Sequence, residues 1–138
     1  MKSLRSMVSA GMALLCLGAI LMSSCNTPHG DMATLLRDID SYHRDLLFER
    51  YEIAAKRITP SERMSWLSAM KSQELHFAEI ELLGTQPCSE YTEQCYIVDS
   101  QMQWYSGSSP SVNSSHVTST WQFDTKTKSW QIVELSQN

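Results

Sequence analysis

The sequence contains few glycines and prolines and lacks any extended basic segment. Among its 138 residues are 5 Gly and 4 Pro, and none of the glycines forms a loop that could cradle a phosphate. No Gly-x-Ser-x-Gly segment occurs, so the sequence has no nucleophile elbow of the α/β-hydrolase kind. The formal net charge is −4, and basic residues gather only in short pairs such as Lys56-Arg57. Without a basic stripe to displace counterions, nucleic-acid binding is not expected.

Residues 1–24 have the pattern of an export signal. Lys2 and Arg5 form a short positive segment, and residues 7–22 then carry no charge and are mostly apolar. This run is short for a membrane-spanning helix, which needs about 20 apolar residues, but it suits the apolar region of a signal peptide. We therefore expect residues 1–24 to be a signal peptide.

The stretch that ends the leader, Leu21-Met22-Ser23-Ser24-Cys25, resembles the bacterial lipobox. In that motif small residues precede a cysteine that becomes lipidated, although leucine is commoner than methionine three positions before it. The resemblance implies palmitate attachment at Cys25 and anchoring in the bacterial cell envelope. Asn26 follows, not Asp, which by the sorting rule of Gram-negative lipoproteins implies the outer membrane, facing the periplasm. The alternative is an ordinary secretory signal that ends at a chance cysteine.

The cysteine count agrees with export. Cys16 lies in the leader and Cys25 would carry lipid, so Cys88 and Cys95 remain as a pair around the polar segment SEYTEQ. An even pair in an oxidising compartment predicts a disulfide. Two free thiols or a metal pair are the alternatives, but a metal needs more ligands than this segment offers. No metal or cofactor is expected.

The rest of the chain divides into a tether over residues 25–31 and one α+β domain over residues 32–138. Apolar residues follow helical spacing from Met32 to Arg57, with a break near Glu49 as the alternative. A second helix is expected from Pro60 to about Gln73, with Thr59 as its cap and Glu62 completing a capping box. Its expected apolar contacts are Met64, Trp66, Leu67, Met70 and Leu75.

Alternating patterns then predict an antiparallel sheet of four strands. They cover residues 76–84, 96–105, 116–124 and 129–135, and the last two form a hairpin through the segment TKTK. Ala78, Ile80 and Leu82 are expected on one face of the first strand. The Ser-rich segment 106–115 is expected to be a loop. Helices followed by strands favour an α+β fold.

Several of these stretches resemble the NTF2-like (cystatin-like) superfamily and small uncharacterised bacterial lipoproteins. They are YHRDLLFERYEIAAKRITPSER, FAEIELLG and TWQFDTKTKSWQIVE, and the resemblance covers roughly residues 40–135. It implies N-terminal helices packed into the concave face of a strongly curved four-stranded antiparallel sheet. It implies no activity, because this fold serves enzymes, binding modules and scaffolds alike.

A pocket inside such a cone would be formed by His43, Tyr42, Trp104 and Trp121. NTF2-like enzymes commonly place an Asp and a His or Tyr there, which makes His43 the candidate base. The favoured alternative is a core-edge histidine satisfied by one hydrogen bond. Likewise, tryptophans on a curved sheet more often fill the core than line a ligand site.

We find no catalytic constellation and expect no enzyme. The expected function is a non-catalytic binding or scaffold domain, anchored to the membrane by its N-terminal lipid and acting on an envelope protein partner. The alternative is a small-molecule binder or enzyme that uses the cone cavity.

Overall fold

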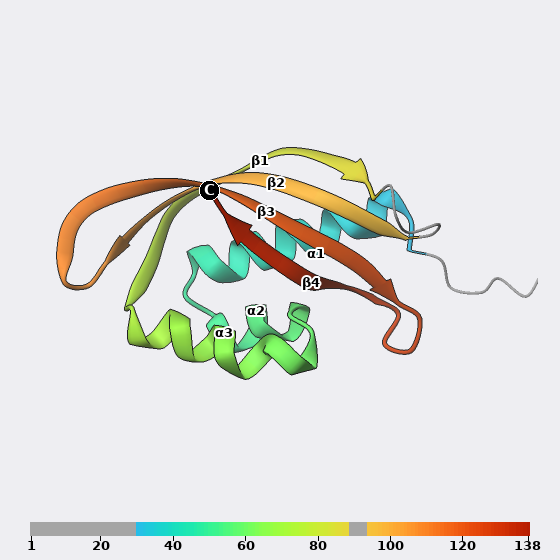
Figure 1. Ribbon diagram of the computed structural model, residues 1–138, viewed down its shortest axis with the longest axis horizontal. Coiled ribbons are helices and arrows are strands. Elements are labelled where there is room, and N and C mark those ends of the chain that lie inside the picture. Colours follow the sequence, from blue (N-terminus) through green and yellow to red (C-terminus); the bar gives the residue numbers. More distant parts are fainter. Residues whose placement is uncertain (1–29, 89–93) are drawn as a thin grey trace, which may run out of the picture.

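The computed structural model describes residues 30–88 and 94–138, which form three helical segments followed by a sheet. The helical part contains α1 (Met32–Leu47), α2 (Tyr51–Ala54), the 3₁₀ turn η1 (Ala55–Arg57) and α3 (Pro60–Ser72). The strands are β1 (Leu75–Pro87), β2 (Cys95–Ser106), β3 (Ser109–Asp124) and β4 (Ser129–Gln137). They pair antiparallel in the order β1-β2-β3-β4, and the curved sheet arches over α1 with α3 on the same side (Figure 1). The predicted α+β class is confirmed.

The described chain begins at the last residues of the expected tether. Asp31 caps α1, since its Oδ1 accepts a hydrogen bond from the Thr34 backbone N–H at 2.7 Å. The expected signal peptide (1–24) and the lipidated Cys25 lie outside the described residues. Within the described ranges, no helix combines the length and apolar character that a membrane crossing requires.

The long N-terminal helix is interrupted, as the alternative reading of its sequence allowed. Helix α1 ends at Leu47, and Glu49 takes a left-handed backbone conformation with φ of 58°. The Arg50 N–H then bonds to the Asp45 carbonyl at 2.8 Å. The reversal at Glu49 turns the chain out of α1 and carries α2 and η1 back toward the sheet.

Helix α3 begins at Pro60, as predicted, but its N-terminus is held differently. The Thr59 side chain makes no capping hydrogen bond, so the expected capping box is wrong. Instead, the Arg63 guanidinium donates to the Ala55 carbonyl at 2.9 Å and to the Ile58 carbonyl at 3.0 Å. No residue of α3 is buried, and Met64, expected to be an apolar contact, is 74% exposed. Helix α3 is therefore held by Arg63 at its start, by partly buried Trp66 against the core and by the exposed Lys71–Glu52 ion pair near its end.

Two expectations about the strands are corrected. A register shift in β1 between Phe77 and Glu79 leaves Ala78 exposed, so Ala78 does not share the buried side of Ile80. The Ser-rich segment is strand, because β3 begins at Ser109 and pairs with Ser106 across a two-residue turn. Backbone pairing with β2 suffices there, so this hairpin needs no alternation of apolar side chains.

The core lies between α1 and the concave face of the sheet. Trp121 and Trp130 are completely buried. The Tyr42 ring meets the Trp121 ring edge-on at 5.8 Å between centroids, and Trp130 contacts the rings of Tyr96 and Phe123 in the same manner. These two tryptophans fill the core, which was the favoured interpretation of their pattern.

The predicted disulfide is present. Cys88 and Cys95 are bonded, with their Cα atoms 5.4 Å apart, and the Cys88 N–H also donates to the Cys95 carbonyl at 3.0 Å. Because Cys88 directly follows β1 and Cys95 begins β2, the bridge fixes the separation of these strands at one end of the sheet.

Candidate functional site

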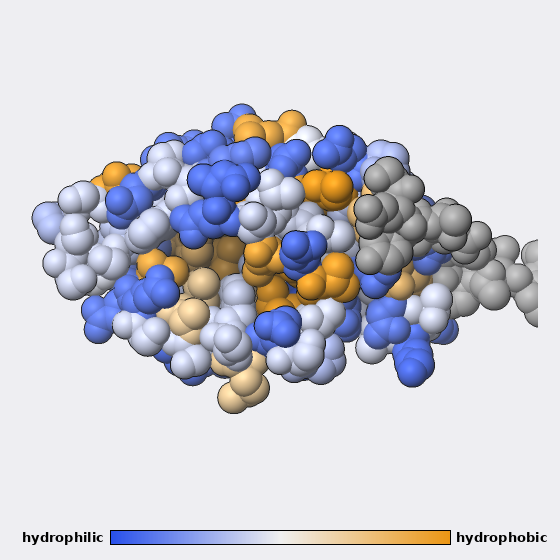
Figure 2. All heavy atoms as spheres, in the orientation of Figure 1, coloured by the Kyte–Doolittle hydropathy of each residue, from blue (hydrophilic) through white to orange (hydrophobic). Residues whose placement is uncertain are grey.

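Among the hollows in the described part of the chain, two run along α3 on the concave side of the sheet. The first, which we call the cone cavity, has a volume of about 290 Å³ and lies between α1, α3 and the sheet. Its lining is mainly aromatic and aliphatic, with Tyr42, Leu46, Trp66, Met70, Phe77, Met102 and Trp104 among the contributors. Figure 2 shows hydrophobic residues at the bottom of a depression in the middle of the face. The interior of the cone is therefore partly open to solvent.

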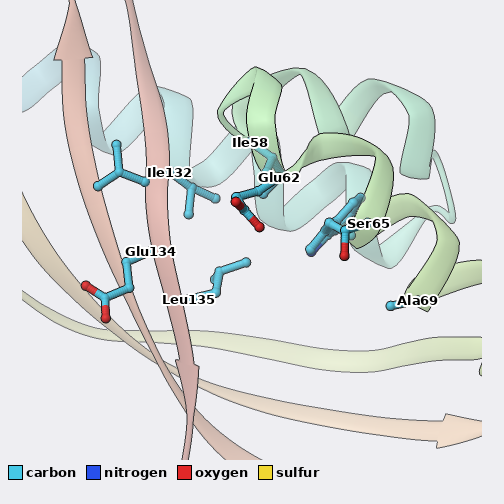
Figure 3. A pocket seen from close by; sticks show the side chains of 9 residues that line it. Ile58, Glu62, Ser65, Ala69, Ile132, Glu134 and Leu135 are labelled. Carbon is cyan, nitrogen blue, oxygen red and sulfur yellow. The ribbon is translucent and has the colours of Figure 1, made fainter.

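The second hollow, which we call the β4 groove, has a volume of about 390 Å³ and separates α3 from β4. Ile58, Glu62, Ser65 and Ala69 approach it from the side of α3, and Ile132, Glu134 and Leu135 from β4 (Figure 3). Trp66 and Leu135 line both hollows. The cone cavity and the β4 groove are thus neighbours that share two apolar side chains.

Two of the polar side chains that line the cone cavity, those of Trp104 and Gln137, share Ser115 as a hydrogen-bond acceptor. The Ser115 hydroxyl oxygen accepts from Trp104 Nε1 at 3.2 Å and from Gln137 Nε2 at 2.7 Å. Burial raises the pKa of the Tyr42 phenol, which stays protonated at physiological pH. The cavity therefore offers an apolar surface with neutral groups, which suits a hydrophobic guest better than a charged one.

His43 lies apart from this cavity. It lines a separate groove between α1 and β1, together with Ile39, Ile80 and Leu82, and its Nε2 is 3.4 Å from the Ser100 hydroxyl. Burial lowers the pKa of His43 to about 4, so the ring is neutral near pH 7. Asp40 and Arg44 also line this groove, so His43 has one hydrogen bond and lies at the edge of the core, where apolar and charged side chains meet.

The four predicted pocket residues are therefore separated. Tyr42 and Trp104 line the cone cavity, Trp121 is buried behind the Tyr42 ring, and His43 faces β1. Sequence reasoning missed Leu135 as a pocket residue. Its alternation with Glu134 marked a strand, but the opening beside it exists only because α3 stands off from β4.

Other ionisable side chains pair at the periphery. His76 Nδ1 lies 2.6 Å from Glu49 Oε1, and its ring stacks on Tyr105. On the outer face of the sheet, Asp99 Oδ1 accepts from Thr118 and lies 3.6 Å from His116 Nε2. No group of three metal-ligating side chains occurs within residues 30–88 and 94–138. None of these pairs opens onto the cone cavity.

Comparison with known proteins identifies the fold alone. The chain resembles the intermembrane space region of the chloroplast protein ARC6, with a TM-score of 0.52 and 11% identity over 80% of this chain and 98% of that one. It also resembles a putative Ca/calmodulin-dependent kinase II association domain from Exiguobacterium sibiricum, with a TM-score of 0.58 and 10% identity over 77% of this chain and 92% of that one. No family model matches the sequence. No curated protein matches it either.

These similarities agree with an NTF2-like arrangement of helices on a four-stranded antiparallel sheet. Identities of 10% and 11% transfer no activity and no binding residues. The cone cavity and the β4 groove are therefore the features of this chain that bear on its function.

Proposed function

We propose that this chain is a lipid-anchored protein of the bacterial envelope whose α+β domain is a non-catalytic binding module for a protein partner. The observation that carries the proposal is the apolar surface left open on both sides of α3. The module would receive apolar side chains of its partner there. One structural relative, the Exiguobacterium sibiricum protein, is described as an association domain, which is in keeping with such a role.

The anchoring part of the proposal rests on the leader and on the chain length after it. Five residue steps separate Cys25 from Gly30, the first described residue, and can span at most about 17 Å. A lipid on Cys25 would hold the domain close to the bilayer. The Cys88–Cys95 disulfide supports an oxidising location, because such bonds are rare in a reducing cytosol.

The binding part of the proposal rests on apolar groups that the fold leaves accessible. Leu135 is 38% exposed and Val133 is 37% exposed, and both border the β4 groove. Trp66 is only partly buried between the two hollows. Apolar surface grouped around a depression is typical of sites that bind another molecule. The position of His43 outside the cone cavity supports a non-catalytic role.

In-cell photo-crosslinking tests the binding proposal. A benzoylphenylalanine placed at Met70, which lines the cone cavity, should yield one dominant adduct with an envelope protein. The matched control places the same group at Gln103 on β2, at a position that alternates to the outer face of the sheet. Equal adducts from both positions, or none from Met70, would contradict a binding surface at α3.

Fractionation tests the anchoring proposal separately. We expect the parent chain to incorporate labelled palmitate and to sediment with membranes. Cys25→Ser should lose the label and release the chain to the soluble fraction, whereas Cys16→Ser should change neither result. Retention of Cys25→Ser at the membrane would show that the anchor is not a lipid on this residue.

A small apolar molecule in the cone cavity is the second candidate, favoured by the aromatic lining of a 290 Å³ space. Native mass spectrometry of the protein purified from membranes would detect such a guest as added mass. Met70→Trp should displace it by filling the cavity. If neither the parent nor the variant carries mass beyond that of its own chain, and Met70 crosslinks to a protein, the occupant of the site is the protein partner.

A further inference from the structure

The outer edge of β4 is only partly covered by other parts of the described chain. Strand β4 is the last in the sheet order, so one of its sides has no neighbouring strand. Only its beginning is covered, where Ile58 forms a parallel bridge with Ile132 and the Thr59 N–H donates to the Ile132 carbonyl at 3.1 Å. Beyond Ile132, no described residue pairs with this edge.

The hydrogen-bond pattern with β3 shows which backbone groups point outward. The Asn138 N–H donates to the His116 carbonyl at 3.0 Å, so these two residues are a hydrogen-bonded pair. In an antiparallel ladder such pairs alternate with pairs whose N–H and C=O groups face away from the partner strand. The pairs Gln137–Val117 and Leu135–Ser119 are of this second kind. The backbone N–H and C=O groups of Gln137 and Leu135 therefore point away from β3. They form a short row of donors and acceptors without a partner strand.

This row borders the β4 groove. Leu135 contributes both the outward backbone groups and an apolar side chain at the boundary with the cone cavity. Trp66 and Ile58 form the apolar wall across from it, as the view in Figure 3 of Ile58 and Leu135 indicates. An occupant that satisfies backbone groups at regular spacing and also fills an apolar groove is an extended polypeptide.

Charge around the groove is negative. Glu62 borders it from α3 and Glu134 from β4, and neither carboxylate has an ion-pair or hydrogen-bond partner among the described residues. In Figure 3 the Glu134 carboxylate points away from α3. A strand laid along β4 would place alternate side chains toward the cavity and beside Glu134. Basic residues at the positions beside Glu134 would complement the negative charge of its carboxylate.

The opposite edge of the sheet is less suited to this role. Strand β1 is also an outermost strand, but two register shifts, at Phe77/Glu79 and at Leu82/Gly84, interrupt its ladder, and it ends at Pro87. Bulges and proline are devices that protect sheet edges from pairing. On β4 the register shift lies before Glu134, and the segment that follows contains neither lysine nor proline.

Building on the proposed binding function, we infer that its protein partner docks as an extended segment that pairs with the β4 edge at Leu135 and Gln137. The partner segment alternates apolar residues, which enter the groove, with basic residues, which lie beside Glu134. The partner strand would continue the sheet where the Ile58 bridge ends.

A defined peptide tests this inference on the full-length protein purified from membranes in detergent. The probe is a ten-residue peptide in which valine alternates with lysine. Its controls replace lysine with glutamate or methylate alternate backbone amides. We expect the valine-lysine peptide to protect residues 133–137 from hydrogen exchange and the two controls to protect them less.

Two substitutions at one position separate backbone pairing from side-chain contact. Leu135→Ala removes the apolar side chain but keeps the outward N–H, whereas Leu135→Pro removes both. Because that N–H does not bond to β3, proline is compatible with the ladder at this edge. We expect Leu135→Pro to bind the peptide about tenfold more weakly than Leu135→Ala, as loss of one backbone hydrogen bond implies. Glu134→Gln should weaken binding about two- to fivefold.

Equal affinities of Leu135→Pro and Leu135→Ala would overturn the inference. So would a doubled mass in sedimentation that Leu135→Pro abolishes, because the occupant would then be a second copy of this chain. The Met70 crosslink distinguishes this failure from failure of the proposed function. If Leu135→Pro retains that adduct, the binding module stands and edge pairing is wrong; if even the parent gives none, the proposed function fails.

Discussion

The buried carboxylate of Asp38 lies 2.9 Å from Arg57 Nη1, and this ion pair joins the middle of α1 to the turn η1. The same carboxylate oxygen accepts from the Trp130 backbone N–H at 3.3 Å, which adds β4 to the connection. One side chain thus fixes the position of the helical segment that leads into α3. We expect Asp38→Ala to lower the free energy of unfolding by about 3 kcal/mol, because it leaves polar groups of two elements without their partner.

A matched control for Asp38 lies on the same helix. Asp40 pairs with Arg44 at 2.5 Å on the exposed surface of α1. Exposed pairs of this spacing contribute about 0.3–0.5 kcal/mol. Urea unfolding of Asp38→Ala and Asp40→Ala should therefore differ by more than about 2 kcal/mol. Similar losses in the two variants would show that burial of the Asp38 pair has no special importance.

The stability of the protein should depend on pH through His43. Its pKa is about 4 in the folded state and 6.5 in an unstructured chain, so the unfolded state binds the proton first as the pH falls. The contribution of neutral, buried His43 to the free energy of unfolding is complete above pH 6.5. It is lost as the pH falls from 6.5 to 4, by at most about 1.4 kcal/mol per pH unit. His43→Gln should show a shallower decline than the parent in urea unfolding over this range. Parallel curves would contradict this prediction.

The disulfide should contribute measurably to stability. It joins residues seven apart, and closing a loop of about eight residues contributes about 2–2.5 kcal/mol in the chain-entropy model. We expect the double variant Cys88→Ala, Cys95→Ala to lose about this amount. Adding a reductant should lower the unfolding midpoint of the parent and leave that of the double variant unchanged.

Arg63 should control the position of α3. Its guanidinium donates to the carbonyls of Ala55 and Ile58, which precede the helix. We expect Arg63→Ala to reduce the free energy of unfolding by about 1–2 kcal/mol and Arg63→Lys to restore only part of it, since lysine lacks the planar fork. Hydrogen exchange should accelerate in α3 before it does in α1. If hydrogen exchange in α3 is as slow in Arg63→Ala as in the parent, contacts other than those of Arg63 hold this helix in position.

Much of the fold could be predicted from the sequence. Pro60 marked the start of α3, and the alternation of Val98 with Met102 and of Trp130 with Ile132 marked buried faces of strands. These patterns are local, because a helix or strand must turn one side of its own chain toward the core. The even cysteine pair likewise predicted the bond between Cys88 and Cys95.

Local patterns were less informative where backbone geometry changes without a marker residue. Glu49 adopts a positive φ with no glycine present, and the bulge beside Ala78 reverses the expected side of that residue. The Ser-rich hairpin after Ser106 has no apolar alternation, so nothing in its composition distinguished strand from loop. In each case the conformation depends on neighbours distant in sequence.

By itself, the sequence determined the α+β class, the order of helices and strands, the core tryptophans and the disulfide. Each follows from the spacing of apolar, proline or cysteine residues along a short segment. Only the tertiary structure decided that His43 and Tyr42, adjacent in sequence, face different hollows, and that Leu135 combines a cavity wall with an unpaired strand edge. These properties depend on how far α3 stands from β4. That distance arises from contacts among Arg63, η1 and β4, which no single segment contains.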